Sequence, residues 1–130
     1  MSTNSSPAYA KHPEHTLTVT PYRGRVVVET PDGEVLVDTR NALALQEAKY
    51  PVVYYVPRSD TRMDRLTKTA HSSVCPFKGT ASYFSVEGQP AAVGENAVWS
   101  YETPFDEVAG IREALAFYGN KLKVRAEPDA

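Results

Sequence analysis

The stretch V-V-V-E-T-P-D-G-E-V-L-V-D, residues 26–38, decides the fold class. Two segments rich in β-branched residues flank Pro31-Asp32-Gly33. Proline restricts φ to about −65° and glycine accepts a positive φ, so this tripeptide favours a tight turn. We therefore predict an antiparallel β-hairpin with strands at 26–29 and 35–38.

Further strands are expected on both sides of this hairpin. Residues 52–56, V-V-Y-Y-V, are apolar or aromatic at every position, which is typical of a strand covered on both faces. One of those faces could line a cavity instead of a filled core. Residues 80–86 alternate between two faces, and we also expect strands at 96–101 and 121–124.

Two segments favour helices. Asn41 can cap a short helix over 42–49, which Pro51 would end. A longer helix is predicted over 105–118, where one apolar stripe recurs at spacings of 3, 4 and 3: Val108, Ile111, Leu115 and Tyr118. The predicted fold is α+β and β-rich, a compact, mostly antiparallel sheet with one short and one longer helix.

A chain of 130 residues is most simply one domain and can bury a core without disulfides. Residues 1–16 are rich in Ser, Pro, Asn and His, and we expect a disordered N-terminal arm that includes His12 and His15. The domain is expected over 17–125, followed by a tail over 126–130.

Charge and composition narrow the class of partner. The formal net charge is −2 and no Lys/Arg-rich run occurs, so we expect no nucleic-acid partner. No apolar run reaches the length of a membrane span, and the first 16 residues lack the apolar centre of a signal peptide. We expect a cytoplasmic protein. The ligand spacings of a metal site are absent, and neither a metal nor a cofactor is expected.

The segment 69–83, T-A-H-S-S-V-C-P-F-K-G-T-A-S-Y, holds the only cysteine of the chain. Cys75 with His71 could form a catalytic pair, because a nearby imidazolium activates a thiol as nucleophile. In an extended chain the two residues lie about 13 Å apart, so direct contact requires a turn at 72–73. The alternative is a structural thiol that packs as a small hydrophobe.

Other side chains suit a small ligand. Lys78 precedes Gly79 and could bind an anion as a point charge or be an ordinary surface lysine. The aromatic residues Tyr83, Trp99 and Tyr101 could stack on a planar ligand or fill the core. Charges alternate over 58–65, either as a solvated loop or as a cluster at the mouth of a pocket.

Four segments, in order, resemble the DUF427 family of small bacterial domains of unknown function: P-R-S-D at 57–60, C-P-F-K-G-T-A-S-Y at 75–83, N-A-V-W-S-Y at 96–101 and A-F-Y at 116–118. The resemblance covers about residues 22–125. The family is also labelled as a nucleotidyltransferase-type domain, but neither a Gly-rich phosphate loop nor paired carboxylates for Mg²⁺ are visible here.

The resemblance implies a β-rich fold with a few short helices, in which the matched segments converge on a pocket. It implies these pocket candidates: Arg58, Asp60, Cys75, Lys78, Tyr83, Asn96, Trp99 and Tyr101. We expect segments 57–64, 71–83 and 96–101 to bind a small polar or aromatic ligand, with Asp60 holding Arg58. Two alternatives remain open: an enzyme with Cys75 as nucleophile and His71 as base, and a protein-interaction or structural module. The oligomeric state is not predicted.

Overall fold

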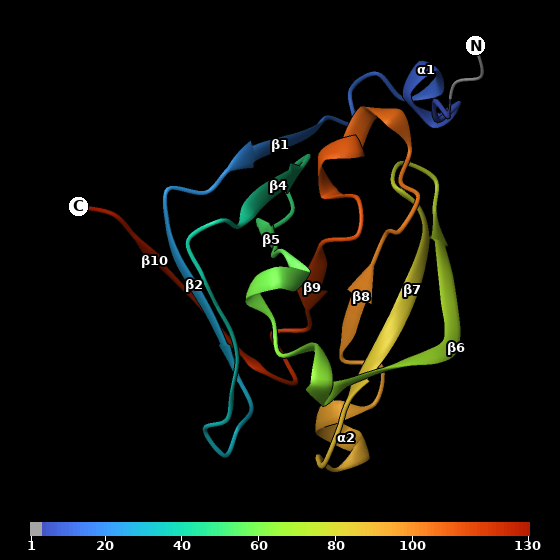
Figure 1. Ribbon diagram of the computed structural model, residues 1–130. Helices are drawn as coiled ribbons and strands as arrows, with labels where there is room; N and C mark the ends of the chain where they lie inside the picture. The colour runs from blue at the N-terminus through green and yellow to red at the C-terminus, as the bar shows by residue number, and fades with distance from the viewer. Residues whose placement is uncertain (1–3) are drawn as a thin grey trace.

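The computed structural model describes residues 4–130 and shows a protein built almost entirely of short antiparallel strands (Figure 1). The strands are β1 (Leu17–Pro21), β2 (Gly24–Glu29), β3 (Val35–Thr39), β4 (Leu43–Glu47), β5 (Val53–Tyr55), β6 (Leu66–Cys75), β7 (Gly79–Val86), β8 (Val98–Ser100), β9 (Leu115–Phe117) and β10 (Lys123–Pro128). The helical elements are α1 (Ala8–Lys11), α2 (Ala91–Gly94) and the 3₁₀ helices η1 (Arg58–Asp60), η2 (Met63–Arg65) and η3 (Asp106–Ile111). None of these helices is long and apolar enough to cross a membrane.

The hairpin predicted at 26–38 is confirmed. Strands β2 and β3 pair antiparallel, with Val28 opposite Val37. Gly33 in the turn has φ of 94°, the left-handed conformation that the Pro-Asp-Gly sequence predicts. β10 adds to the other edge of β2, which gives a three-stranded sheet in the order β10-β2-β3.

The two segments that form β2 and β3 continue beyond this sheet and contribute β1 and β4 to a second sheet. β1 runs into β2 and β3 runs into β4, and the backbone N–H of Tyr22 donates to the carbonyl oxygen of Ala42 across the corner. β1 and β4 then pair with β5 in the order β1-β4-β5. At the bend, Gly24 lies against the backbone of Glu127 and Pro128.

The third sheet has the order β6-β7-β8-β9, and it joins the second sheet through one residue pair. Val56 and Leu115 exchange two backbone hydrogen bonds of 2.8 and 2.9 Å. β5 therefore lies beside β9, and the sheets enclose a common interior (Figure 1).

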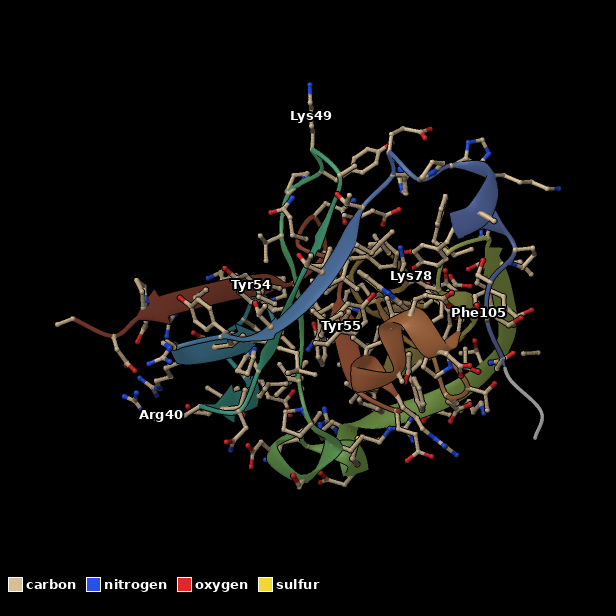
Figure 2. The ribbon with its side chains drawn as sticks, turned by 90° about the horizontal axis from the view of Figure 1, so that it is seen from above. Arg40, Lys49, Tyr54, Tyr55, Lys78 and Phe105 are labelled. Carbon is tan, nitrogen blue, oxygen red and sulfur yellow. The ribbon has the colours of Figure 1, made fainter. Side chains whose placement is uncertain are left out.

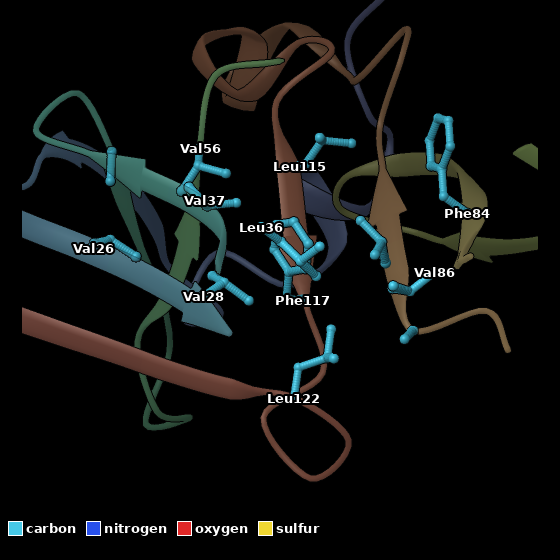
Figure 3. Close-up of a cluster of buried hydrophobic side chains, with 13 residues drawn as sticks. Val26, Val28, Leu36, Val37, Val56, Phe84, Val86, Leu115, Phe117 and Leu122 are labelled. Carbon is cyan, nitrogen blue, oxygen red and sulfur yellow. The ribbon is translucent and has the colours of Figure 1, made fainter. Parts of the chain in front are cut away.

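Two hydrophobic clusters fill the interior, one on each side of β5. The first gathers Val26, Val28, Leu36 and their neighbours around Phe117, between β2 and the β7–β9 sheet (Figure 3). The second contains Tyr55 and most of the aromatic side chains of β7 and β8. Tyr54 packs on the first cluster and Tyr55 belongs to the second, so β5 is covered on both faces as its composition predicts.

The helix predicted over 42–49 is wrong, because residues 43–47 form strand β4. Leu45 is fully buried, with Val19 of β1 opposite it on one side and Val53 of β5 on the other. The segment satisfies its backbone groups through two neighbouring strands, and this pairing outweighs its moderate helix propensity.

The helix predicted over 105–118 is also wrong. Its first part is the 3₁₀ helix η3, in which Val108 and Ile111 are buried. Glu113 then takes a positive φ of 62°, and the chain turns into β9, all of whose residues are buried. Three residues of the stripe, Val108, Ile111 and Leu115, are buried as predicted, and Tyr118 is half-buried. Backbone pairing with β8 and with Val56 decided the conformation. The protein is β-rich as predicted, and its helices are fewer and shorter than an α+β fold implies.

Other boundaries shift by a few residues. The strand expected at 96–101 is reduced to β8, because Asn96 has a positive φ of 49°. The strand expected at 121–124 becomes β10, which continues through Pro128. Of the expected disordered arm, residues 1–3 lie outside the described residues, whereas residues 4–16 make specific contacts with the rest of the chain.

Gly24→Ala should destabilise the fold strongly. An added Cβ would lie 2.3 Å from the Glu127 carbonyl oxygen and 2.8 Å from the Pro128 Cα, so β10 would have to separate from β2. We expect the free energy of unfolding in urea to fall by about 2 kcal/mol or more. Gly119→Ala is the matched control, since open space surrounds Gly119. Equal urea midpoints for the two variants would contradict this account.

Candidate functional site

A cavity of about 210 Å³ lies beside the second hydrophobic cluster, between β4, β5, β7 and β8. We call it the aromatic cavity. Its lining residues are Leu45, Glu47, Val53, Tyr55, Lys78, Tyr83, Trp99, Tyr101 and Tyr118. Four of these residues, Lys78, Tyr83, Trp99 and Tyr101, are predicted ligand-binding residues, and the fold brings them together.

Strand register explains how the aromatic side chains meet. Tyr83 of β7 lies opposite Trp99 of β8. Tyr101, two residues beyond Trp99, lies on the same side of the chain. The Trp99 indole N–H donates to the Tyr55 hydroxyl at 3.3 Å, and the Trp99 ring lies 4.5 Å from the ring of Tyr118. Neighbouring strands therefore fix the cavity walls.

One end of the cavity carries a chain of charged groups. Lys78 Nζ donates to Glu47 Oε1 at 2.5 Å, and the second oxygen of Glu47 pairs with His15 Nε2 at 2.7 Å. The side chains of Lys78 and Glu47 are only 11% and 20% exposed. Lys78 and Tyr55 lie within the body of the protein, whereas Lys49 projects from the surface (Figure 2).

The environment of the cavity alters several pKa values. Burial alone would raise the pKa of Glu47, but hydrogen bonds and charge from Lys78 and His15 hold it below its ordinary value. Burial raises the pKa of Tyr55 and Tyr101 well above the ordinary value for tyrosine. Burial and a hydrogen bond with Tyr83 raise the pKa of Tyr118 to about 12. At neutral pH the Tyr55, Tyr101 and Tyr118 hydroxyls are thus protonated, and Glu47 is ionised.

The hydroxyl of Tyr101 has no hydrogen-bond partner among residues 4–130. The residue is only 6% exposed. Within the described chain, every fully buried side-chain nitrogen or oxygen has a partner. The Tyr101 hydroxyl therefore keeps some contact with solvent, and the residue lines the aromatic cavity.

His71 and Asn96 lie outside the aromatic cavity, in an adjoining open depression. Tyr83 and Tyr118 line both spaces, and the His71 ring lies 4.5 Å from the ring of Tyr83. Asn96 is engaged locally, since its side-chain oxygen accepts a hydrogen bond from Thr69. These two predicted residues are therefore neighbours of the cavity and not part of its wall.

Cys75 and His71 are not arranged as a catalytic pair. Ser72 and Ser73, where a turn would be needed, pair with Ser82 and Ala81 in the regular ladder between β6 and β7. Four residues along such a strand separate Cys75 from His71 by about 13 Å. Cys75 packs instead against the second hydrophobic cluster.

Arg58 and Asp60 have different partners from the expected ones, and the prediction that Asp60 holds Arg58 is wrong. Arg58 donates to the Glu113 carbonyl at 2.7 Å and pairs with Glu102 at 3.2 Å. Asp60 accepts hydrogen bonds from the side chains of Thr39 and Asn41. The backbone turns at η1 and so directs the two side chains to different partners.

Sequence reasoning missed three contributors to the site. Tyr55 was assigned only to a strand, Glu47 to a helix face, and His15 to a disordered arm. The alternation of Leu43, Leu45 and Glu47 is a signal that could have placed the carboxylate on the same strand face as the buried leucine. Nothing in the sequence near His15 indicates its partner, because Glu47 lies 32 residues away.

Comparison with known families identifies one that matches most of the chain. The model of the family described as a domain of unknown function (DUF427) matches residues 18–128. The chain belongs to this family. The match includes every residue that lines the aromatic cavity, and it leaves out residues 4–16. The family description assigns no reaction, and no curated protein matches the chain. No group of three or more His, Cys, Asp or Glu side chains in the described part of the domain could hold a metal ion.

Glu47→Gln should weaken the fold, and the loss should depend on pH. Because the folded pKa of Glu47 lies below the ordinary 4.5, its ionised form stabilises the protein above that pH, and this stabilisation is lost as the pH falls further. At pH 7 we expect the variant to lose about 1–3 kcal/mol of unfolding free energy, since Lys78 keeps no carboxylate partner. Between about pH 5 and 3 its stability should decline less steeply than that of the wild type.

Urea unfolding at several pH values measures this difference. Asp64→Asn is the control, because it breaks an exposed ion pair with Arg62 and leaves the cavity intact. If Glu47→Gln changes stability no more than Asp64→Asn does at pH 7, the Glu47–Lys78 pair contributes nothing to the fold.

Proposed function

We propose that this DUF427 domain binds a small, neutral, planar ring compound in the aromatic cavity. The observation that carries the proposal is the unpartnered hydroxyl of Tyr101, a residue that lines a cavity with five aromatic side chains in its wall. Concave sites with apolar walls and a few polar groups are the usual form of small-molecule sites.

The size of the cavity limits the ligand to about one ring. A cavity of 150 Å³ in another protein accommodates benzene, and the aromatic cavity measures about 210 Å³. A single ring with one or two substituents fits this space, whereas a typical drug-sized site begins at about 300 Å³.

The charges of the cavity favour a ligand without net charge. Lys78 and Glu47 already neutralise each other at 2.5 Å. A charged ligand would either remain unpaired in a poorly solvated space or take one partner from this pair, and both events are costly. A neutral ring with a hydrogen-bond acceptor could instead accept from Tyr101 while its faces pack on Trp99 and Tyr83.

The enzyme alternative receives no support from the arrangement of Cys75 and His71. In our proposal Cys75 contributes to packing. Arg58 serves to hold η1 against β8 and the Glu113 backbone, through the contacts that it makes there. Lys78, Tyr83, Trp99 and Tyr101 are the residues that contact the ligand.

Trp99 makes the proposal testable, because it is the only tryptophan and its fluorescence reports on the cavity. We expect benzamide and phenol to change this fluorescence saturably. Cyclohexanol, which is similar in size but not planar, should bind more weakly because it cannot stack. Tyr101→Phe, which removes one oxygen atom, should weaken benzamide binding about 5- to 10-fold.

Tyr50→Phe is the control, because Tyr50 is exposed and lies outside the aromatic cavity. It should leave benzamide binding unchanged. Absence of saturable binding by either aromatic probe at millimolar concentration would refute the proposal. A specific protein partner, found without any such binding, would favour an interaction module instead.

A further inference from the structure

The described N-terminal segment, residues 4–16, crosses the part of the protein that carries Lys78. We call this segment the strap. Its far end is attached to the first residue of η3, Asp106. The Asp106 N–H donates to the Asn4 carbonyl oxygen at 3.0 Å, and the Asn4 N–H donates to the Asp106 carboxylate at 2.9 Å. The Ser6 backbone N–H donates to Glu107 at 3.1 Å.

The middle of the strap holds the turn between β6 and β7. The Ser6 hydroxyl donates to the Pro76 carbonyl at 2.5 Å, and the Tyr9 hydroxyl donates to the Phe77 carbonyl at 2.9 Å. The Phe77 side chain lies among strap rings, with its centroid 5.2 Å from Tyr9 and 4.2 Å from His15. Both residues immediately before Lys78 are thus held by the strap.

The near end of the strap contacts the wall of the cavity through Glu47. His15 pairs with the Glu47 oxygen that Lys78 does not use. Glu47 and Lys78 both line the aromatic cavity. His15 therefore fixes the carboxylate that in turn fixes the Lys78 ammonium, while the strap fixes the Lys78 backbone through its two preceding residues.

Little apolar surface holds the strap in place. α1 contains no buried residue, and Ser6 is the only strap residue that is almost fully buried, at 4% exposure. Its attachments are mainly single hydrogen bonds and ring contacts, each of modest net free energy. Segments with few buried apolar contacts open at free energies well below that of global unfolding.

We propose that the strap closes the Lys78 end of the aromatic cavity and that its local release gives access to the cavity, with His15 as the residue that positions the Glu47–Lys78 pair. The inference rests on the proposed function for its purpose, since a ligand must enter and leave. The strap lies outside residues 18–128, which match the family model.

Two natural reporters measure strap release without any ligand. Cys75 is the only cysteine, and it precedes the Pro76 carbonyl that Ser6 holds. Tyr9 holds the Phe77 carbonyl, two residues after Cys75 in the chain. Trp99 lines the cavity and is the only tryptophan. Alkylation of Cys75 by iodoacetamide therefore reports on exposure of the β6–β7 turn beneath the strap. Quenching of Trp99 by acrylamide reports on access to the aromatic cavity.

The experiment compares His15→Ala and Tyr9→Phe with the wild type in the full chain at one fixed pH. Tyr9→Phe loses one hydrogen bond of the strap, and His15→Ala loses the pair with Glu47 and the ring contact with Phe77. We therefore expect Cys75 alkylation to accelerate at least about fivefold and Trp99 quenching to increase. The midpoint of urea unfolding should move little, because the core is untouched. Tyr9→Phe also keeps the ring on Phe77, so its effect isolates the hydroxyl.

Two controls separate release from a general loss of stability. His12→Ala removes an exposed side chain whose ring lies farther from Phe77, at 6.3 Å, and it should leave both rates within about twofold. His15→Gln keeps a side-chain N–H that can reach Glu47, and it should recover most of the wild-type behaviour. If His15→Ala folds poorly, Tyr9→Phe remains as the informative comparison.

Unchanged alkylation and quenching in both His15→Ala and Tyr9→Phe would overturn the inference. It would equally be overturned if alkylation accelerated only in proportion to global unfolding, which the urea dependence of the rate measures. Neither readout requires a bound ring. Strap release could therefore be shown while benzamide and phenol fail to bind, which would remove the proposed ligand alone.

Discussion

The backbone pair between Val56 and Leu115 is the contact on which the rest of the structure depends. Its two hydrogen bonds join the sheet that contains β5 to the sheet that contains β9. With the sheets joined, β5 has one cluster on each face, and Tyr55 is directed toward the aromatic residues of β7 and β8. Without this pair, the aromatic cavity would lose the relative placement of its walls.

The cavity exists because the aromatic side chains that meet there also carry polar atoms. Trp99 donates its N–H to the Tyr55 hydroxyl, and Tyr83 pairs with Ser73, but the Tyr101 hydroxyl has no partner in the described chain. The Lys78–Glu47 pair adds charges that a tightly packed apolar core would exclude. An interior of this kind is less stabilising than a filled one, and it retains room and hydrogen-bonding groups for a small molecule.

Part of the fold and part of the site could be predicted from local sequence. Turn chemistry at Pro31-Asp32-Gly33 identified the first hairpin, and the aromatic alternation of β7 and β8 identified Tyr83, Trp99 and Tyr101. The helix predictions over 42–49 and 105–118 failed for a common reason. In both segments other strands, and not a helix, satisfy the backbone groups, as Val19 and Val53 do for Leu45 and Val56 does for Leu115.

By itself, the sequence determined which residues are apolar, where the tight turns fall, and that the chain resembles the DUF427 family. Tertiary structure alone decided which polar groups meet. The Glu47 carboxylate joins Lys78 and His15, which lie 31 and 32 residues away from it along the chain. It also separated Arg58 from Asp60 and His71 from Cys75. The physical reason is that turns and strand periodicity depend on neighbouring residues, whereas an ion pair depends on the register of strands that the chain brings together only when it folds.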